Sequence, residues 1–447
     1  MTYQSGMNGL LPPAELRARF AAALSDMYRA EVPQYGALLA LVKDVNRETI
    51  AADPALADAL LASGEFGRID QERHGAIRLG TAAELAAVAR AFRLMGMRPV
   101  SYYDLATAGV PVHSTAFRPV EAEELAASPF RVFTSLLRLE LIDDAGLRAE
   151  AAEILGRRQI INEEALSLLA EGEAASGLDE REAGRFVTAL LETFRWHQRA
   201  TITEECYARL LASHRLTADV VSFPGPHINH LTPRTLDIDA AHARMAALGF
   251  GPKDEIEGPP ARACPILLRQ TSFRALSEKV HFPGGASGAQ GSHTARFGEI
   301  EQRGAALTRE GRIRYDRWIA GGGDLDLPDD GEELRRQRLA FFRYQPSDAR
   351  PRERRGESLE ELIADGAVIA TPITYEDFLP VSAAGIFRSN LGDEARGGYA
   401  ATGSRAEFEQ ALGEPTLDEF TLYAGAQADS LRALERAFGW PEGSAAT

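Results

Sequence analysis

The stretch His227-Ile228-Asn229-His230-Leu231-Thr232-Pro233-Arg234 decides the fold, because a shorter copy of it stands much earlier as His74-Gly75-Ala76-Ile77-Arg78. In each copy a histidine lies four residues before an arginine, and a helical stretch that ends at a glycine follows. Self-similarity of this kind is typical of a chain built from repeated structural units. We therefore predict two related units, each made of a strand, an amphipathic helix, a turn and a second strand.

The two helical stretches carry matching start and stop signals. The first is expected to begin at Thr81, whose side chain can reach the first-turn amides while Glu84 reaches back, and to end at Gly96. The second has Asp237 at its positive end and Gly249 as its stop. Apolar residues recur at spacings of three and four in both, which predicts one buried face for each helix.

Composition indicates an ordinary globular protein of more than one structural unit. The chain has 447 residues, of which 45% are hydrophobic and 26% charged, and its formal net charge is −16. A length of this order exceeds what one hydrophobic core usually supports. The acidic balance argues against nucleic acid and anionic membranes as partners, because their phosphates require a basic surface.

Targeting and redox signals are equally plain. Cys206 and Cys264 are the two cysteines, and their wide separation predicts free thiols in a reducing cytoplasm rather than a disulfide or a thiolate zinc site. Residues 1–13 have neither the basic start nor the apolar run of a signal peptide, and no stretch approaches the length needed to span a bilayer. The sequence leaves the oligomeric state open.

The order of helical and strand-like stretches predicts an α+β fold with a curved sheet or barrel assembled from the two repeat units. We expect five segments. They are a helical segment at 1–64, the first half of a metal-binding β-module at 65–140, an inserted helical region at 141–218, the second half of the module at 219–345, and a C-terminal segment that closes the site at 346–447. The glycine-rich residues 283–292 lack the Gly-Lys-Ser/Thr of a phosphate loop, and a mobile hairpin connection is favoured. Whether it acts as a lid is open.

His74 and His230, one from each repeat, are the candidate metal ligands. A lone histidine is more often structural than a ligand, but two at equivalent places in a repeat favour a shared site. Two histidines and one carboxylate leave adjacent coordination positions open on iron(II), as oxygen-using enzymes require. His227 competes with His230. On a strand the two would face opposite sides, and His230 keeps the register of His74.

The carboxylate is expected on the strand-like residues 296–304, where Glu299 and Glu301 share a face. Spacing does not separate them, and a surface ladder of charges is the competing interpretation. Arg78 lies on the same strand face as His74, about 13 Å along. It could bind the far carboxylate of a short diacid, although a structural ion pair is an equal alternative. Arg234 holds the corresponding place but follows Pro233, which can turn its strand.

Several motifs resemble known families. The segment from Ile228 to Phe250 is similar to the opening of vicinal-oxygen-chelate modules, and Glu299-Ile300-Glu301-Gln302-Arg303 resembles the Glu-Ile-Ile-Gln-Arg of 4-hydroxyphenylpyruvate dioxygenase, which favours Glu299 over Glu301. A longer resemblance runs from about residue 15 into the C-terminal region. There, residues 72–80, 227–237, 292–304 and 378–387 resemble the 2-oxoadipate dioxygenase/decarboxylase family, also called 2-hydroxyglutarate synthase.

This resemblance implies a site and a reaction. Iron(II) would be held by His74, His230 and Glu299, with Arg78 on the substrate carboxylate as the catalytic positioning group and the backbone around Val381 and Ser382 closing the pocket. The substrates would be 2-oxoadipate and O2, and the products D-2-hydroxyglutarate and carbon dioxide, within D-lysine catabolism. Two alternatives stay open from the residues alone, namely a glyoxalase-like isomerase that uses nickel or zinc, and a non-catalytic protein that binds a metal or ligand.

Overall fold

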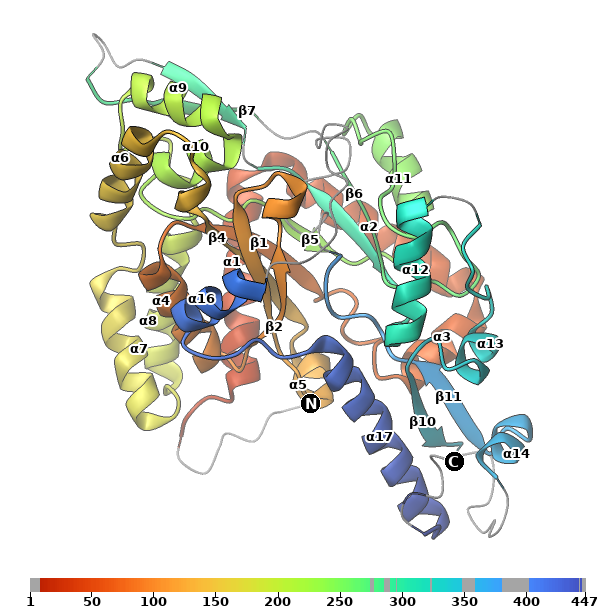
Figure 1. Ribbon diagram of the computed structural model, residues 1–447. Helices are drawn as coiled ribbons and strands as arrows, with labels where there is room; N and C mark the ends of the chain where they lie inside the picture. Colours follow the sequence, from red (N-terminus) through yellow and green to blue (C-terminus); the bar gives the residue numbers. More distant parts are fainter. Residues whose placement is uncertain are drawn as a thin grey trace.

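The computed structural model describes residues 9–273, 277–284, 290–294, 296–321, 324–347, 358–379, 402–441 and 443. Its largest sheet has five strands in the order β2-β3-β4-β1-β5 (Figure 1). They are β1 (Arg73–Leu79), β2 (Arg98–Asp104), β3 (Val112–Arg118), β4 (Phe130–Leu137) and β5 (Leu231–Pro233). β1 runs parallel to β4 and antiparallel to β5, whereas β2, β3 and β4 form an antiparallel meander. The two strands predicted on either side of the first expected helix, residues 81–96, are thus present as β1 and β2.

Helices cover both faces of this sheet, which is why β3 and β4 are buried along their whole length. One face packs against α1 (Pro13–Glu31), α4 (Ala82–Leu94), α7 (Glu163–Ala175) and α8 (Glu180–Leu191). The other packs against α6 (Ala145–Gly156), α9 (Glu204–Ser213) and α10 (Arg215–Ser222), which gather at one end of the molecule in Figure 1. The helices α6 to α10 lie between β4 and β5 in the chain.

Alternation along β1 decides which of its side chains reach the site. Ile77 and Leu79 enter the core formed with α1 and α4, whereas Ala76 belongs to the core on the opposite face. Because side chains alternate along a strand, His74 and Arg78 lie on the same face as Ala76. This agrees with the expectation that both residues face one side.

The second unit begins with β5 and continues through α11 (Ile238–Ala247) to a separate two-stranded sheet of β6 (Leu268–Ser272) and β9 (Glu299–Arg303). Between α11 and β6 the chain is irregular. α2 (Pro33–Ala52) packs on α11 in a small core of its own, which also holds Ile300 of β9. α3 (Pro54–Ala62) follows α2 and completes the helical N-terminal segment.

The expected barrel does not form among the described residues, because all the sheets there are open. β5 has three residues and ends at Pro233, which has no N–H for the ladder. Among the described residues, the chain after β5 pairs with β9 through a bridge between Arg234 and Glu301. In it Thr235 N donates to Glu301 O at 2.7 Å. The two sheets are therefore joined over a few residues, and these residues lie beside the candidate metal site described below.

The helix signals are confirmed with one difference. The Thr81 side chain accepts from the amide of Glu84, and Gly96 takes the left-handed φ of 71° that ends α4. Asp237 likewise caps α11. The Glu84 carboxylate, however, accepts from Gly80 N at 2.7 Å and pairs with Arg158 instead of closing a box with Thr81.

The remaining described elements surround this frame. They are α5 (Ala122–Ala127), the hairpin β7 (Ser277–His281) and β8 (Gln290–Thr294), α12 (Arg309–Gly321), α13 (Gly331–Arg336), the antiparallel pair β10 (Phe342–Pro346) and β11 (Val368–Pro372) with α14 (Leu359–Ala364) between them in the chain, α16 (Thr402–Leu412) and α17 (Glu419–Phe438). The β7–β8 pairing confirms a hairpin around the glycine-rich stretch, whose residues 285–289 lie outside the described part. Within the described residues, no helix is both long and apolar enough to cross a membrane.

Candidate metal centre

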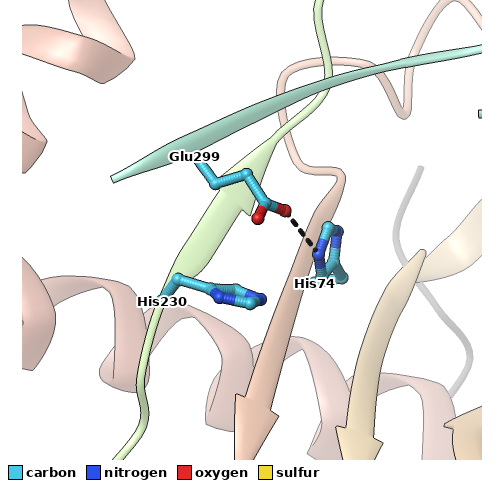
Figure 2. A group of neighbouring side chains, drawn as sticks. All are labelled: His74, His230 and Glu299. Atoms are coloured by element: carbon cyan, nitrogen blue, oxygen red, sulfur yellow. Dashed lines mark ion pairs between the residues drawn. The ribbon is translucent and has the colours of Figure 1, made fainter. Parts of the chain in front are cut away.

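His74, His230 and Glu299 lie together where the two sheets meet (Figure 2). His74 is on β1, His230 directly precedes β5, and Glu299 begins β9. The close approach of the His230 segment to β1 depends on Gly75, because a Cβ there would lie 2.4 Å from Ile228 Cδ1. A Cβ on Gly298 would similarly collide with the Phe273 ring, so the chain before Glu299 also requires glycine.

The geometry of these three side chains suits a shared ion. One ligand atom from each lies within 4.8 Å of the other two, and all three residues are buried. His74 Nε2 is 3.2 Å from Glu299 Oε1, and the imidazole rings of His74 and His230 meet edge to face with centroids 5.2 Å apart. Metal–ligand bonds to nitrogen and oxygen are about 2.1 Å long, so small side-chain shifts would bring all three onto one ion.

Several buried atoms at the centre lack a hydrogen-bond partner among the described residues. They are both ring nitrogens of His230 and the Oε2 atom of Glu299, while the ring nitrogens of His74 face carboxylate oxygens of Glu299 and Glu301 at 3.2 and 3.0 Å. Buried polar atoms are nearly always paired, because leaving them unpaired costs free energy. A divalent cation would satisfy the atoms that converge here, and two imidazoles with one carboxylate are a donor set that suits iron(II). The residues present therefore fit the metal that the sequence implies.

Hydrogen bonds to one oxygen orient the Glu299 carboxylate. Its Oε1 atom accepts from Thr232 Oγ1 at 3.1 Å and from Gln270 Nε2 at 2.9 Å, and it is also the oxygen that lies 3.2 Å from His74 Nε2. Burial raises the pKa of Glu299, but the charges of His230 and His74 more than offset this and the pKa is lowered. The group is thus an anion ready to bind a cation.

The two histidines differ in protonation. Burial lowers the pKa of His230 to about 4, with His74 and Arg78 acting in the same direction, so its imidazole is neutral as a ligand must be. Burial also lowers the pKa of His74, but the carboxylates of Glu301 and Glu299 outweigh it and the pKa is raised. A cation that binds His74 Nε2 would therefore compete with a proton at that atom.

Glu301 faces the other nitrogen of His74. Its Oε2 lies 3.0 Å from His74 Nδ1, and Arg303 grips the carboxylate with two bonds of 2.9 Å. Burial raises the pKa of Glu301, but Arg303 and His74 lower it to about 2 overall. The structure thereby separates the two glutamates that spacing alone did not. Glu299 joins the ligand group, and Glu301 holds the far side of the imidazole, as outer carboxylates do at metal-bound histidines.

Arg78 lies beside the centre with most of its side chain buried. Its Nη1 donates to Asp219 Oδ2 of α10 at 2.7 Å, and its charge contributes to the lowered pKa of His230. The ion pair, one of the two interpretations of Arg78 from the sequence, is therefore present, whereas binding of a substrate carboxylate by Arg78 stays a prediction. Asp219 was missed, since no motif links α10 to β1.

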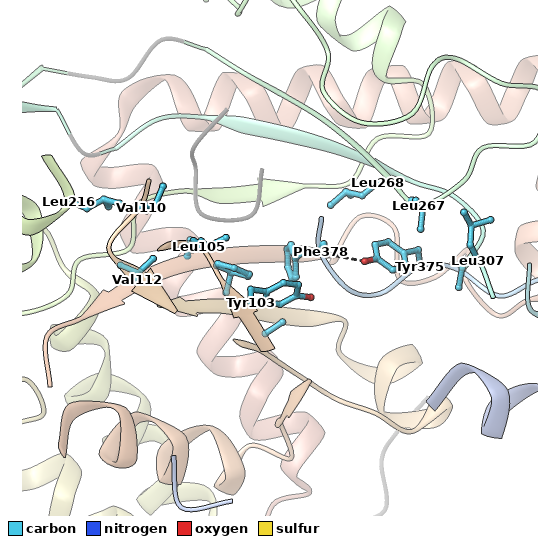
Figure 3. Packing of buried hydrophobic residues seen from close by; sticks show 14 of the residues in the cluster. Tyr103, Leu105, Val110, Val112, Leu216, Leu267, Leu268, Leu307, Tyr375 and Phe378 are labelled. Carbon is cyan, nitrogen blue, oxygen red and sulfur yellow. Dashed lines mark hydrogen bonds between the residues drawn. The ribbon is translucent and has the colours of Figure 1, made fainter. Parts of the chain in front are cut away.

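The C-terminal segment reaches the centre through Phe378. Its ring lies 4.9 Å from that of His74, and it packs between Tyr103 and Tyr375 in Figure 3. Arg303 fixes this segment by donating to the backbone carbonyls of Tyr375 and Asp377. Val381 and Ser382, which the sequence places at the pocket, lie outside the described residues.

A carboxyl pair is buried behind Phe378. Asp377 accepts two bonds from Arg118, of 2.7 and 2.9 Å, and Glu419 of α17 accepts from Ser101 Oγ at 2.8 Å. Burial and then the Asp377 charge raise the pKa of Glu419 to about 7, against the opposing charges of Arg312 and Arg118. Glu419 is therefore a buried carboxyl group that titrates near neutral pH.

The structure corrects the placement of His227. The strand begins at Leu231, so the argument from opposite strand faces does not hold, and both histidines are buried. His227 is kept apart from the ligand group by its contact with Asp219, 3.4 Å from Nε2 to Oδ1. His293 is also buried and donates to Asp219 from a distant part of the chain. Arg234 pairs with Glu65 and Glu72, so it does not act as a second Arg78.

Sequence reasoning also missed a buried ion network behind β1. Arg131 of β4 stands opposite His74 in the sheet and pairs with Glu72 and Glu376, while Arg68 binds Glu376 with two bonds of 3.0 Å. Burial lowers the pKa of Arg131 to about 9. Charged residues in a strand usually indicate an exposed face, so nothing in the sequence signalled this network.

The fold and this centre define a class of mixed helix and sheet proteins with a buried site of two histidines and one carboxylate. A putative glyoxalase superfamily protein from Ralstonia eutropha shares the fold, with a TM-score of 0.50 and 20% identity over 67% of this chain and 87% of that chain. More specifically, the family model for 2-oxoadipate dioxygenase/decarboxylase matches residues 20–390, and the chain belongs to that family.

Two relatives from Pseudomonas putida agree with this assignment. The protein named 2-oxoadipate dioxygenase/decarboxylase is 54% identical, covering 96% of this chain and 98% of its own length. The crystal structure of the hydroxyglutarate synthase in complex with 2-oxoadipate superimposes with a TM-score of 0.89 at 51% identity, covering 97% of this chain and 100% of that chain.

Proposed function

We propose that this chain is an iron(II)-dependent dioxygenase/decarboxylase that converts 2-oxoadipate and O2 to D-2-hydroxyglutarate and CO2. The observation that carries the proposal is that ligand atoms of His74, His230 and Glu299 converge in a buried site. Arg78 lies on the same face of β1 as His74. Membership of the family and the 2-oxoadipate in the related Pseudomonas putida structure support it.

The proposed reaction balances without an external reductant. The C1 carboxyl group of 2-oxoadipate leaves as CO2, and the two electrons of the broken C1–C2 bond, with two more from the C3–H bond, reduce O2. One atom of O2 enters the new carboxylate at C2, and the other becomes the hydroxyl on C3. A bound ferrous ion supplies the electron transfer and Lewis acidity that such a reaction of a 2-oxo acid with O2 requires.

The residues of the chain have separate roles in this scheme. Glu299 is kept anionic and turned toward the ligand group by Thr232 and Gln270, so it can neutralise part of the charge of the cation. Arg78 can bind the far carboxylate of the diacid, since a guanidinium pairs with carboxylates through paired N–H donors. The substrate is then held at both ends, which fixes the hydrogen on C3 that is replaced.

Phe378 and the backbone beyond it would close the pocket. Its ring packs against His74 and Phe133, so an apolar wall stands beside the ligands. Exclusion of water strengthens the charge interactions inside a site and limits side reactions. We propose that Val381 and Ser382, which lie outside the described residues, take part in substrate binding.

The proposal also covers the origin of the fold and the pathway in which the enzyme acts. We regard β1–α4–β2 and β5–α11–β6 as two related vicinal-oxygen-chelate modules, each of which supplies one histidine. We also place the reaction in D-lysine catabolism in the cytoplasm. Chiral chromatography of the product tests its configuration.

Aerobic incubation with iron(II) and 2-oxoadipate tests the proposal. We expect mass spectrometry to find 2-hydroxyglutarate, with one O2 consumed for each CO2 released and label from ¹⁸O2 in the product carboxylate. A glyoxalase-like isomerase would act without consuming O2 and would accept nickel or zinc. A non-catalytic binding protein would bind the oxo acid tightly and release no CO2, and either result would overturn the proposal.

A further inference from the structure

A second polar cluster lies on the α10 side of the metal centre, centred on Asp219. Its Oδ2 atom accepts from Arg78 Nη1 at 2.7 Å, and its Oδ1 atom accepts from His293 Nε2 at 2.7 Å. The three residues come from α10, β1 and β8, which are far apart in the sequence. We propose that Asp219, held by His293, fixes the guanidinium of Arg78 and so gives the enzyme its preference for dicarboxylic over monocarboxylic 2-oxo acids, an inference that rests on the proposed function.

Asp219 is a buried anion. Burial raises the pKa of its carboxyl group, but His227, His293 and Arg78 together lower it far below the ordinary value. Its side chain is 5% exposed and that of Arg78 is 11% exposed. An ion pair with so little water around it is directional and weakly screened, so it holds the arginine in one rotamer.

His293 fixes Asp219 in turn. Because Nε2 of His293 donates to the carboxylate, the hydroxyl of Tyr207 can donate to Nδ1, from which it lies 2.9 Å. The imidazole ring is also parallel to that of Trp196, with centroids 6.1 Å apart. The chain of contacts from Tyr207 through His293 and Asp219 to Arg78 therefore has a defined direction at each step.

This arrangement serves a diacid in particular. A guanidinium carries five N–H donors in a fixed plane, and the bond to Asp219 uses one of the donors of Arg78. Because the rotamer is set before the substrate arrives, less conformational entropy is lost on binding. A 2-oxo acid without a far carboxylate does not use Arg78 and would gain nothing from its orientation.

The simpler explanation is that Asp219 is only a counterion for a buried arginine. In that case its removal would destabilise the fold and affect all substrates alike, or would free Arg78 and improve diacid binding. The positioning role makes a different prediction, because only substrates that contact Arg78 would respond. The ratio of kcat/KM for 2-oxoadipate to that for 2-oxohexanoate, which lacks the far carboxylate, distinguishes the two.

The test uses the iron-loaded protein and O2 uptake with both substrates. We expect Asp219→Asn to lower kcat/KM for 2-oxoadipate about 10- to 100-fold, since displacement of about 1 Å at a positioning group costs this much, and to leave 2-oxohexanoate within about twofold. His293→Leu should reproduce this loss, whereas His293→Gln keeps an N–H donor and should retain most of the preference. His242→Gln, whose histidine bonds Thr271 on another element, is the control and should change neither substrate.

A double variant provides an independent readout. If Asp219 acts through Arg78, adding Asp219→Asn to Arg78→Met causes no further loss with 2-oxoadipate, because coupled residues are non-additive. Equal losses with both substrates, a raised preference for the diacid, or additive losses in the double variant would each overturn the inference. Wild-type protein that does not oxidise 2-oxoadipate would overturn the proposed function itself, whereas an active wild type with an unchanged ratio in Asp219→Asn overturns only this step.

Discussion

Replacing Glu301 by glutamine tests how the outer carboxylate supports the centre. In the folded protein Glu301 Oε2 lies 3.0 Å from His74 Nδ1, and Arg303 holds the carboxylate with two bonds of 2.9 Å. Glu301→Gln keeps the size of the side chain and removes the charge. His74 then loses the anion that orients its ring and raises the basicity of its ligand nitrogen.

The size of the effect follows from these contacts. A hydrogen bond to a charged group contributes about 1.5 to 3 kcal/mol net, and Arg303 already offsets the rest of the carboxylate charge. Loss of an outer carboxylate typically costs about 10- to 100-fold in metal affinity, which matches that range. We therefore expect the Kd for iron(II) to rise by about one to two powers of ten in Glu301→Gln.

The assay is an anaerobic titration of iron(II) in competition with a chromophoric chelator. Glu84→Gln is a matched control, because Glu84 is equally buried and accepts two bonds from Arg158, of 2.7 and 2.8 Å, but does not belong to the ligand group. Thermal unfolding of both variants separates general destabilisation from loss of metal. A Kd that changes by less than about twofold in Glu301→Gln, or by the same factor in Glu84→Gln, would refute the reasoning.

Three further predictions concern other side chains. His230→Ala, His74→Ala and Glu299→Ala should each lose bound iron and turnover, whereas His227→Ala should retain iron. Elemental analysis after reconstitution with iron(II) checks this, and the reverse pattern would contradict the ligand set. Arg78→Ala should raise KM for 2-oxoadipate at least about 10-fold and lower the enantiomeric excess of the product, and unchanged kinetics would count against the diacid argument. Because the pKa of Glu419 is raised to about 7 in the folded state, the free energy of unfolding should fall as pH rises from about 4.5 to 7. Urea titrations at pH 5 and 8 measure this fall, and Glu419→Gln should remove up to about 3 kcal/mol of it. An unaltered dependence of the unfolding free energy on pH in this variant would refute the prediction.

The local rules of secondary structure predicted most of the frame. The order of strand, helix and second strand in the repeat predicted β1 and β2, and the signals at Thr81, Gly96 and Asp237 located both ends of α4 and the start of α11. These features depend on neighbours a few residues away, which the sequence displays directly. The prediction of a barrel was wrong for the described residues. Closure of the sheet depends on how far β5 extends, and β5 ends at Pro233 after three residues.

Part of the site could likewise be predicted from the sequence, and part could not. His74 and Arg78 share a strand face at short spacing, so their common orientation could be predicted, and the repeat indicated His230 as the partner of His74. Asp219 and His293 could not be found, because they are 74 positions apart and meet Arg78 only through the packing of α10 and β8. The distinction between Glu299 and Glu301 likewise required knowing which nitrogen of His74 each one faces.

The central claim is that His74, His230 and Glu299 hold one ferrous ion. An anomalous difference map, collected at the iron absorption edge from crystals loaded with iron(II) without oxygen, tests it most directly. We expect a single strong peak about 2.1 Å from one nitrogen of each histidine and from Glu299 Oε2. A peak between Asp219, His227 and His293, or no peak at the first position in fully loaded protein, would contradict the account.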